Sequence, residues 1–385
     1  MSTDMYLPNL PDVARDLGAT DTMAQLTMTS MMVGGALGQL VLGPLSDRFG
    51  RRRPALIGTA LHVLTCALCV FAPTIVPLIA YRAAMGVFNA SAGVVAMAVL
   101  RDRFVGRDAA RLMSRLMLVI GVAPLFAPNI GSFIGRYVGW RGVFAALGLY
   151  GVFLFVSMLL RLPETLPDER RSAGVAVTLR GYGHLMADRH FVALAAIPAL
   201  ISSVLMAYIV ASPFVLQQEF QLTKLQFAMV FALNGIGLVG GAQVNAALVK
   251  SFSPSKIMRL ALPASTAMCL ALMTVGLTGW GGLPALVVTL FLVMSLQNLS
   301  SSNASALALT RHGERAGTAA ACMGFMQGIV PALLAPIVGL LGNQAWAMGL
   351  VMAASAAAAL GILAFGTPIY RPGGVELLDR LPSLR

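Results

Sequence analysis

The amino-acid sequence predicts an all-α polytopic membrane protein, and both its composition and its hydropathy pattern point to that class. Of the 385 residues, 58% are apolar and 11% are charged, whereas a soluble globular domain is about 45–50% apolar and about 25% charged. The mean hydropathy is +0.81. The apolar runs are continuous and reach the ~20 residues of a spanning helix, whereas strands of a membrane barrel alternate in segments of about ten residues. Too little polar surface remains to cover soluble domains.

Charged residues mark the ends of the predicted spans. No charge interrupts the run between Asp21 and Asp47, and the longest charge-free runs, 260–310 and 316–370, each contain a glycine-containing turn near the middle. Each piece is long enough to cross a bilayer as a helix. We therefore expect eleven full spans, at 24–44, 54–72, 76–98, 114–135, 142–160, 191–213, 225–248, 257–278, 284–308, 317–341 and 345–366.

The basic residues predict how these spans are oriented. Most of the 27 lysines and arginines lie in or beside alternate loops, at 45–54, 100–115, 161–189, 250–259, 309–316 and after 370. Basic loops face the cytoplasm. We therefore expect a monomeric, multi-pass protein of a bacterial-type inner or plasma membrane, embedded in the lipid bilayer with a cytoplasmic C-terminus. This topology accounts for the net charge of +12 and leaves no basic soluble surface for a nucleic-acid partner.

The odd number of spans bears on the N-terminus. Eleven crossings that end in the cytoplasm place residues 1–22 outside. Residues 1–10 would cover only about 15 Å as a helix, half a membrane, and they do not read as a signal peptide. We therefore expect Met1 to be an internal start within an incomplete first helix. An unusual outside terminus is the alternative.

Two halves with the same plan are predicted. The long polar segment 161–189 separates them as a cytoplasmic linker, so we expect an N-terminal helical bundle at 1–160 with an incomplete first span, a C-terminal bundle at 190–366 and a cytoplasmic tail at 367–385. The spans at 114–135 and 317–341 share a Gly/Pro pattern: Gly121, Pro124, Pro128 and Gly131 in the first; Gly328, Pro331, Pro336 and Gly339 in the second. Such interrupted spans at corresponding positions of two halves indicate a transporter.

The loop between the first two full spans carries a dense set of charges and glycines. It reads Gly43-Pro44-Leu45-Ser46-Asp47-Arg48-Phe49-Gly50-Arg51-Arg52-Arg53-Pro54. Gly43 and Gly50 are expected to allow a tight reversal. Asp47 can accept hydrogen bonds from helix N-terminal amides or from arginines, and the arginines can bind helix C-termini. A simple positive-inside anchor is the alternative interpretation.

This loop resembles the signature G-x-L-x-D-R-x-G-R-R/K of the major facilitator superfamily. Other segments resemble its Bcr/CflA drug-resistance antiporters, namely 2–8, 101–104, 123–128, 163–166 and 301–304. The resemblance implies two six-helix bundles and a secondary active transporter that exchanges protons for small lipophilic drugs of the chloramphenicol or bicyclomycin kind. It also implies a conformational latch made by Gly43, Asp47, Arg48, Gly50, Arg51 and Arg52. The corresponding loop of the second half, at 249–259, is degenerate.

Two ionisable residues stand out within this frame. Arg82 lies inside a predicted span, where an arginine costs at least ~2.5 kcal/mol on insertion scales. We expect it to face a wet cavity or pair with an acid; snorkelling to the outer face is the alternative. The resemblance implies that Asp4 takes up the coupling proton, with Arg82 as its electrostatic counterpart. Asp4 is otherwise a solvated residue at the chain end.

Further candidates are uncharged. By resemblance, Gly121, Pro124, Pro128 and Gly131 form the antiporter-motif helix, with plain helix packing as the alternative. Polar residues inside spans are weak candidates for the substrate cavity, with interhelical hydrogen bonding as the alternative; they are Asn89, Asn234, Gln297, Asn298 and Asn303.

Other classes of function fit the sequence less well. It contains no G-K-[ST] phosphate loop and no HExxH motif, so we expect neither an enzyme nor an ATP-driven pump, and no metal or cofactor. A major-facilitator importer of a sugar or another small nutrient remains the alternative. We rank it lower because the chain has only three tryptophans and a single acid at membrane depth.

Overall fold

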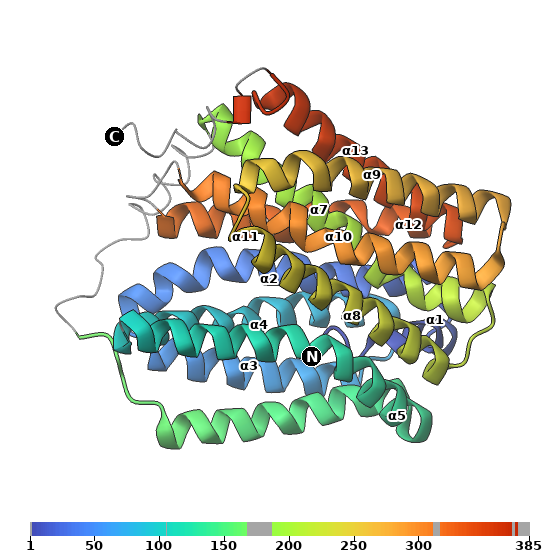
Figure 1. Ribbon diagram of the computed structural model, residues 1–385. Coiled ribbons are helices and arrows are strands. Elements are labelled where there is room, and N and C mark those ends of the chain that lie inside the picture. The colour runs from blue at the N-terminus through green and yellow to red at the C-terminus, as the bar shows by residue number, and fades with distance from the viewer. Residues whose placement is uncertain (1, 105, 168–186, 311–315, 372–373, 376–385) are drawn as a thin grey trace. The chain divides into compact units, whose positions relative to one another are not determined.

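The computed structural model describes residues 2–104, 106–167, 187–310, 316–371 and 374–375, which form helices and no strands. The chain divides into two compact units, Met1–Leu179 and Arg180–Arg385, and each is described by itself. The boundary falls in 168–186, so most of the predicted linker at 161–189 lies outside the described residues, as does most of the predicted tail at 367–385. The all-α membrane fold is confirmed (Figure 1).

Unit 1 pairs long helices with a short, buried N-terminal segment. Its elements are η1 (Leu7–Asn9), α1 (Leu10–Asp16), α2 (Asp21–Phe49), α3 (Arg52–Val70), α4 (Ile75–Arg103) and α5 (Gly106–Arg161). The helix α2 packs along α4, and α3 packs against both α4 and α5. Proline, which lacks an amide hydrogen, stands in the first turn of both η1 and α1. Thr20 caps α2 by accepting a hydrogen bond from the Met23 amide at 3.3 Å.

A break at Gly139 divides α5 into two arms. The helix has 56 residues, but Gly139 adopts φ 74° and ψ 179°, which is a conformation that favours glycine. Figure 1 shows α5 folding back on itself. Ten helices in the described residues are long and apolar enough to span a membrane, and one of them, Phe126–Arg161, crosses this break. The spans predicted at 114–135 and 142–160 therefore occupy the two arms of α5. They form one continuous element because only Gly139 departs from helical φ and ψ between them.

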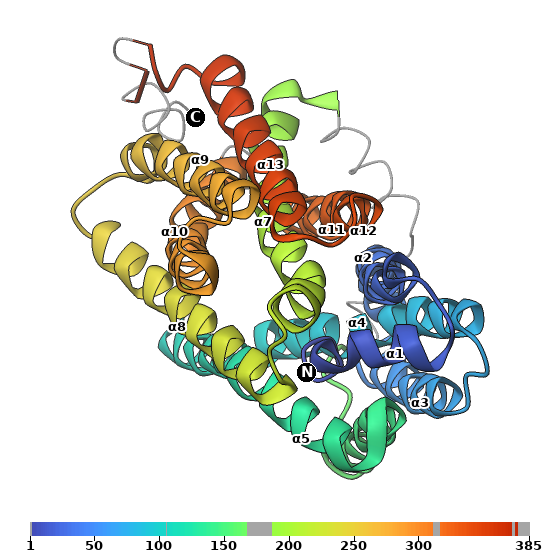
Figure 2. The same cartoon turned by 90° about the vertical axis from the view of Figure 1, so that its right-hand side faces the viewer.

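Unit 2 is built around α7. Its elements are α7 (Arg189–Phe214), η3 (Val215–Glu219), α8 (Lys224–Leu248), α9 (Pro254–Thr278), α10 (Gly282–Thr310), α11 (Ala316–Leu334), α12 (Pro336–Leu340) and α13 (Ala345–Gly366). Helices α10, α11 and α13 pack against α7, as Figure 2 shows. The buried core between them includes Ile197, Ile201, Leu262 and Leu363. The span predicted at 317–341 is divided into α11 and α12 just before Pro336.

Two polar contacts satisfy helix starts in unit 2. In unit 2, Glu219 at the end of η3 accepts a 2.8 Å hydrogen bond from the Ala345 amide, which begins α13. The buried first residue of that helix thus gains an acceptor for its otherwise unpaired amide. Elsewhere in the unit, Thr223 and Gln226 form a capping box at the start of α8.

Glycine permits the closest approach between helices of unit 1. A β-carbon built on Gly34 in α2 would overlap the carbonyl oxygen of Ala83 in α4, and one on Gly86 would overlap the carbonyl of Met31. The helices α2 and α4 therefore touch backbone to backbone. This is the contact that small residues allow in membrane proteins.

Replacing Gly34 by Ala is therefore expected to destabilise the protein, because the backbone of α4 must move to make room. Overpacking costs ~1–3 kcal/mol, so the midpoint of thermal unfolding in detergent should fall. Gly93→Ala in α4 is the matched control, since no atom lies within 4 Å of its β-carbon position. Equal midpoints for Gly34→Ala and Gly93→Ala would contradict this packing.

Candidate functional site

Arg51 is the centre of a charged network at one end of unit 1. Its side chain is 8% exposed, and its Nη1 donates to Asp47 Oδ1 at 2.5 Å while its Nε donates to Asp102 Oδ2 at 2.9 Å. Nη1 also donates to the Ser46 hydroxyl at 2.9 Å. Burial by itself lowers the pKa of the Arg51 guanidinium, but the bonds to Asp102 and Asp47 raise it above the ordinary value. Arg51 is thus a permanently charged cation, and in this structure it lies between the two carboxylates.

Glu164 completes this network by capping α3. Its carboxylate accepts hydrogen bonds from the backbone amides of Arg51 at 2.7 Å and Arg52 at 3.2 Å, and from those of Thr165 and Leu166 at 3.0 Å each. Partial burial raises the pKa of the Glu164 carboxyl, but these amides outweigh it and hold the pKa below its usual value. Gly50, with φ 85°, packs directly on the carboxylate, where a β-carbon would overlap it.

The predicted latch residues are only partly brought together. Asp47, Gly50, Arg51 and Arg52 meet in the network, and Arg52 also donates to the Leu159 carbonyl at 2.9 Å. The Arg48 guanidinium lies over the neighbouring Phe49 ring at 5.2 Å. The prediction that Gly43 helps to reverse the chain is wrong, because α2 continues as a helix to Phe49. The helix tolerates Pro44 near its end, so the reversal is made at Gly50 alone.

The sequence analysis missed the contribution of Asp102 and Glu164. Both lie in segments that were noted only for a family resemblance, 101–104 and 163–166. Each is an acid within a basic loop, and this pattern predicts an ion pair or hydrogen bond with one of the neighbouring arginines. Which of several arginines would be that partner depends on the packing of α3 against α4 and α5, and this is not readable from spacing.

Arg82 forms the second polar centre of unit 1, deep among its helices. The side chain is 0% exposed. Its Nε donates to the Thr27 carbonyl at 3.3 Å, and its Nη1 donates to the Ser2 carbonyl at 3.1 Å. The guanidinium also donates to two thioether sulfurs, that of Met28 at 3.2 Å and that of Met85 at 3.5 Å. Complete burial excludes the alternative in which Arg82 reaches the outer surface.

Aromatic rings cover the rest of the Arg82 guanidinium. Its Cζ lies 4.7 Å from the centroid of the Tyr6 ring and 5.6 Å from that of Phe144. The two rings contact each other with centroids 5.1 Å apart, and the Tyr6 hydroxyl shares a 3.1 Å hydrogen bond with the Thr27 hydroxyl. These cation–π contacts are worth ~2 kcal/mol or more when desolvated. They add no negative charge.

Asp4 lies close to this centre along the chain. It is half-buried in the turn that precedes η1, two residues from Ser2 and two from Tyr6, which both contact Arg82. Among the described residues, the hydrogen-bond acceptors of Arg82 are carbonyl oxygens and thioethers. The fully buried Arg82 therefore faces no wet cavity, and the expected pairing with an acid is not among its contacts in the described residues.

The other candidates are dispersed. Asn89 is exposed and lines a cleft of about 140 Å³ with Ser2 and His62. The surroundings of Gly121 and Pro124 lie outside the described part, whereas Pro128 and Gly131 are buried. In unit 2 each candidate amide donates a hydrogen bond to a neighbouring helix: Asn234 to Tyr208, Gln297 to the Ile201 carbonyl, Asn298 to the Leu238 carbonyl and Asn303 to Asn245, at 2.7 to 3.2 Å. The alternative of interhelical bonding thus holds for these four.

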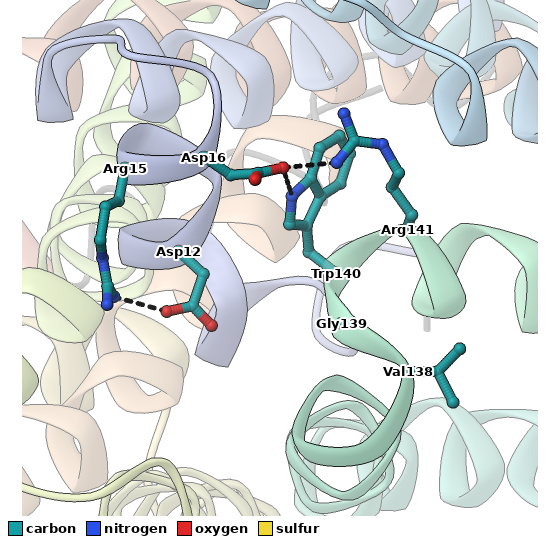
Figure 3. Close-up of a pocket in the computed structure, with 7 residues that line it drawn as sticks. All are labelled: Asp12, Arg15, Asp16, Val138, Gly139, Trp140 and Arg141. Carbon is teal, nitrogen blue, oxygen red and sulfur yellow. Dashed lines mark hydrogen bonds and ion pairs between the residues drawn. The ribbon is translucent and has the colours of Figure 1, made fainter.

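A cleft that the sequence does not reveal lies beside the Gly139 break (Figure 3). Its volume is about 610 Å³, and α1 forms one wall. The Asp16 carboxylate accepts hydrogen bonds from Trp140 Nε1 at 2.9 Å and from Arg141, and Asp12 pairs with Arg15 at 2.7 Å. The Trp140 and Arg141 hydrogen bonds lower the pKa of the Asp16 carboxyl, so Asp16 stays ionised and ties α1 to the second arm of α5.

Long apolar helices in two compact units, interrupted by glycine and proline and enclosing a buried arginine, are the architecture of a secondary transporter. Comparison with known proteins is consistent with this class. The profile of the Major Facilitator Superfamily matches residues 1–336. The chain therefore belongs to the major facilitator superfamily.

Relatives within that superfamily include proteins named for drug resistance. The MFS-type transporter YdgK of Bacillus subtilis is 33% identical over 369 residues, which cover 95% of this chain and 91% of YdgK. A bicyclomycin resistance protein homolog of Haemophilus influenzae is 29% identical over 336 residues, covering 87% of this chain and 84% of the relative. The xylose transporter XylE of E. coli, at 16% identity and a TM-score of 0.70 over 99% of this chain and 96% of XylE, shows the shared fold.

The Glu164 cap predicts an acid-dependent stability. Because the folded pKa of Glu164 is lowered, its stabilisation is complete above the ordinary glutamate pKa and is lost as the pH falls through the folded value. The thermal unfolding midpoint of Glu164→Gln in detergent should lie below that of the wild type at pH 7, and the gap should narrow between about pH 5 and pH 3.

Asp108→Asn provides the control for this measurement, since Asp108 is an exposed acid at the start of α5. Its midpoint should follow that of the wild type through the same pH range. A Glu164→Gln gap that keeps its neutral-pH size at pH 3 would show that the carboxylate charge plays no part in the cap.

Proposed function

We propose that the chain is a secondary active efflux transporter that exchanges protons for small lipophilic drugs by alternating access. The observation that carries this proposal is the buried Arg82 guanidinium, enclosed by the segment that contains Asp4. The drug-resistance names of the relatives support the choice of substrate class. Chloramphenicol-like and bicyclomycin-like compounds are the first candidates.

The chemistry of coupling follows from the charge on Arg82. Carbonyls, thioethers and aromatic rings solvate the guanidinium without neutralising it, and an uncompensated charge away from water is costly. An ionised Asp4, in the segment whose Ser2 and Tyr6 contact Arg82, would lower that cost, and a protonated Asp4 would restore it. Proton uptake on Asp4 and release from it thus change the free energy of the Arg82 site. A protein with two packing states can use this difference to drive its transition.

The Arg51 network supplies the second part of the mechanism. It joins the end of α2, the start of α3, the end of α4 and the segment after α5 through one guanidinium and three carboxylates. We assign it the role of a latch that must be rearranged during transport. By the positive-inside rule this network and the C-terminus face the cytoplasm of a bacterial-type plasma membrane, and the transporter acts as a monomer.

The proposal predicts that Asp4→Asn abolishes drug/proton exchange, because the amide cannot take up the proton. The protein is reconstituted in liposomes with radiolabelled chloramphenicol, and accumulation driven by an imposed pH gradient is measured. We expect a loss of at least about 10²-fold, within the range attributed to proton-transfer groups.

Asp12→Asn serves as the matched control, because Asp12 is an acid of the same N-terminal region that pairs with Arg15 at the cleft beside the Gly139 break. It should retain pH-driven accumulation. Normal pH-driven accumulation by Asp4→Asn would overturn the assignment of Asp4. A wild type that accumulates neither chloramphenicol nor ethidium under a pH gradient would overturn the proposed function itself.

A further inference from the structure

The backbone of residues 5–9 lies directly on one face of α5. Gly131 and Gly135, four residues apart, are neighbours on one face of that helix. A β-carbon on Gly131 would overlap the backbone carbonyl of Met5, and one on Gly135 would overlap the side-chain amide of Asn9. An added carbon at Gly131 would have to move the backbone of Met5, and one at Gly135 would have to displace the Asn9 side chain. Gly131 and Gly135 therefore form a surface on which residues 5–9 pack, and we call this surface the seat.

A directional bond fixes the segment in that seat. Asn9 is 0% exposed, and its Nδ2 donates a 3.0 Å hydrogen bond to the Gly131 carbonyl. In a membrane helix a backbone carbonyl is already engaged in the helix ladder, so a second donor uses its remaining lone pair. A side chain of another shape would either leave this buried donor position empty or clash with Gly135. The seat and this hydrogen bond thus fix how close residues 5–9 lie to α5 and where they lie along its axis.

The same segment is in contact with Arg82. Met5 and Asn9 rest on the seat, and between them the Tyr6 ring covers the guanidinium at 4.7 Å and packs on Phe144. Asp4 immediately precedes Met5. A displacement of the segment away from α5 would therefore carry Tyr6 and Asp4 with it and change their position relative to Arg82.

We propose that Gly131, Gly135 and Asn9 are positioning residues for proton coupling: they hold the segment that bears Asp4 and Tyr6 at a set distance from Arg82. This inference rests on the proposed function. Under this inference the seat affects proton coupling and not drug passage, because Gly131 and Gly135 contact the segment that bears Asp4. An added methyl group at the seat should uncouple proton movement from drug movement and leave drug passage largely intact.

Two transport modes distinguish uncoupling from simple damage. Wild type, Gly131→Ala and Gly135→Ala are reconstituted in liposomes with radiolabelled chloramphenicol. Uphill accumulation is driven by a pH gradient, and equilibrium exchange is measured without one. We expect uphill accumulation by the two variants to fall at least about tenfold, since misplacement by 1 Å costs up to about 10²-fold, while equilibrium exchange changes less than about twofold.

Two control variants bracket this result. Gly241→Ala in α8 would create an equally close overlap, with the Ser295 carbonyl, but in unit 2, whereas Arg82 belongs to unit 1. We expect it to lower both transport modes together. Gly93→Ala adds a methyl group where no atom lies within 4 Å, and both modes should match the wild type.

A third seat variant avoids overpacking altogether. Asn9→Ala removes the hydrogen bond to Gly131 without adding an atom, so it keeps the test open if the glycine variants fail to fold. It should show the same selective loss of uphill accumulation. Parallel losses in both modes for the seat variants, as for Gly241→Ala, or no loss in either mode, would overturn the positioning role. Absence of pH-driven accumulation in the wild type would instead overturn the proposed function, and the positioning role with it.

Discussion

The enclosure of one guanidinium constrains the whole interior of unit 1. Arg82 sits on α4, and its partners come from the N-terminal turn, from α2 and from the second arm of α5. The N-terminal turn supplies a carbonyl oxygen and an aromatic ring, α2 supplies a carbonyl oxygen and a thioether, and α5 supplies an aromatic ring. Because a buried cation loses its water, every one of these contacts replaces hydration. The helices can pack tightly only in arrangements that keep them all.

The close contact of α2 with α4 serves the same end. Gly34 and Gly86 let the two backbones touch, which brings the Thr27 carbonyl and the Met28 thioether of α2 within reach of Arg82 on α4. A larger separation would lengthen both hydrogen bonds. Packing by small residues and solvation of the charge are therefore parts of one arrangement, in which the apolar contact positions the polar one.

The sequence was sufficient for the fold but not for the network at the end of unit 1. Gaps between charges located the spans because a charge inside a bilayer is costly, so scarce charges concentrate at helix ends. That rule says nothing about pairing. Asp102 and Glu164 meet Arg51 only because α3 packs on α4 and α5, which places residues more than 50 and 110 positions apart at one point. Gly43 failed as a turn residue for the opposite reason: local propensity favoured a reversal, but the helix persists to Phe49.

Asp16 and Glu219, each at the end of a short helical segment, have a consequence for how each unit can deform. In unit 1, Asp16 joins the end of α1 to the start of the second arm of α5; in unit 2, Glu219 joins the end of η3 to the start of α13. Each acid therefore bonds a helical segment near the beginning of its unit to the last long helix of that unit. When an early and a late helical segment of a unit are bonded to each other, neither can move away from the other without breaking that bond. The bonds of Asp16 and Glu219 therefore couple the early and late helices of each unit, so each unit is suited to turn as one piece.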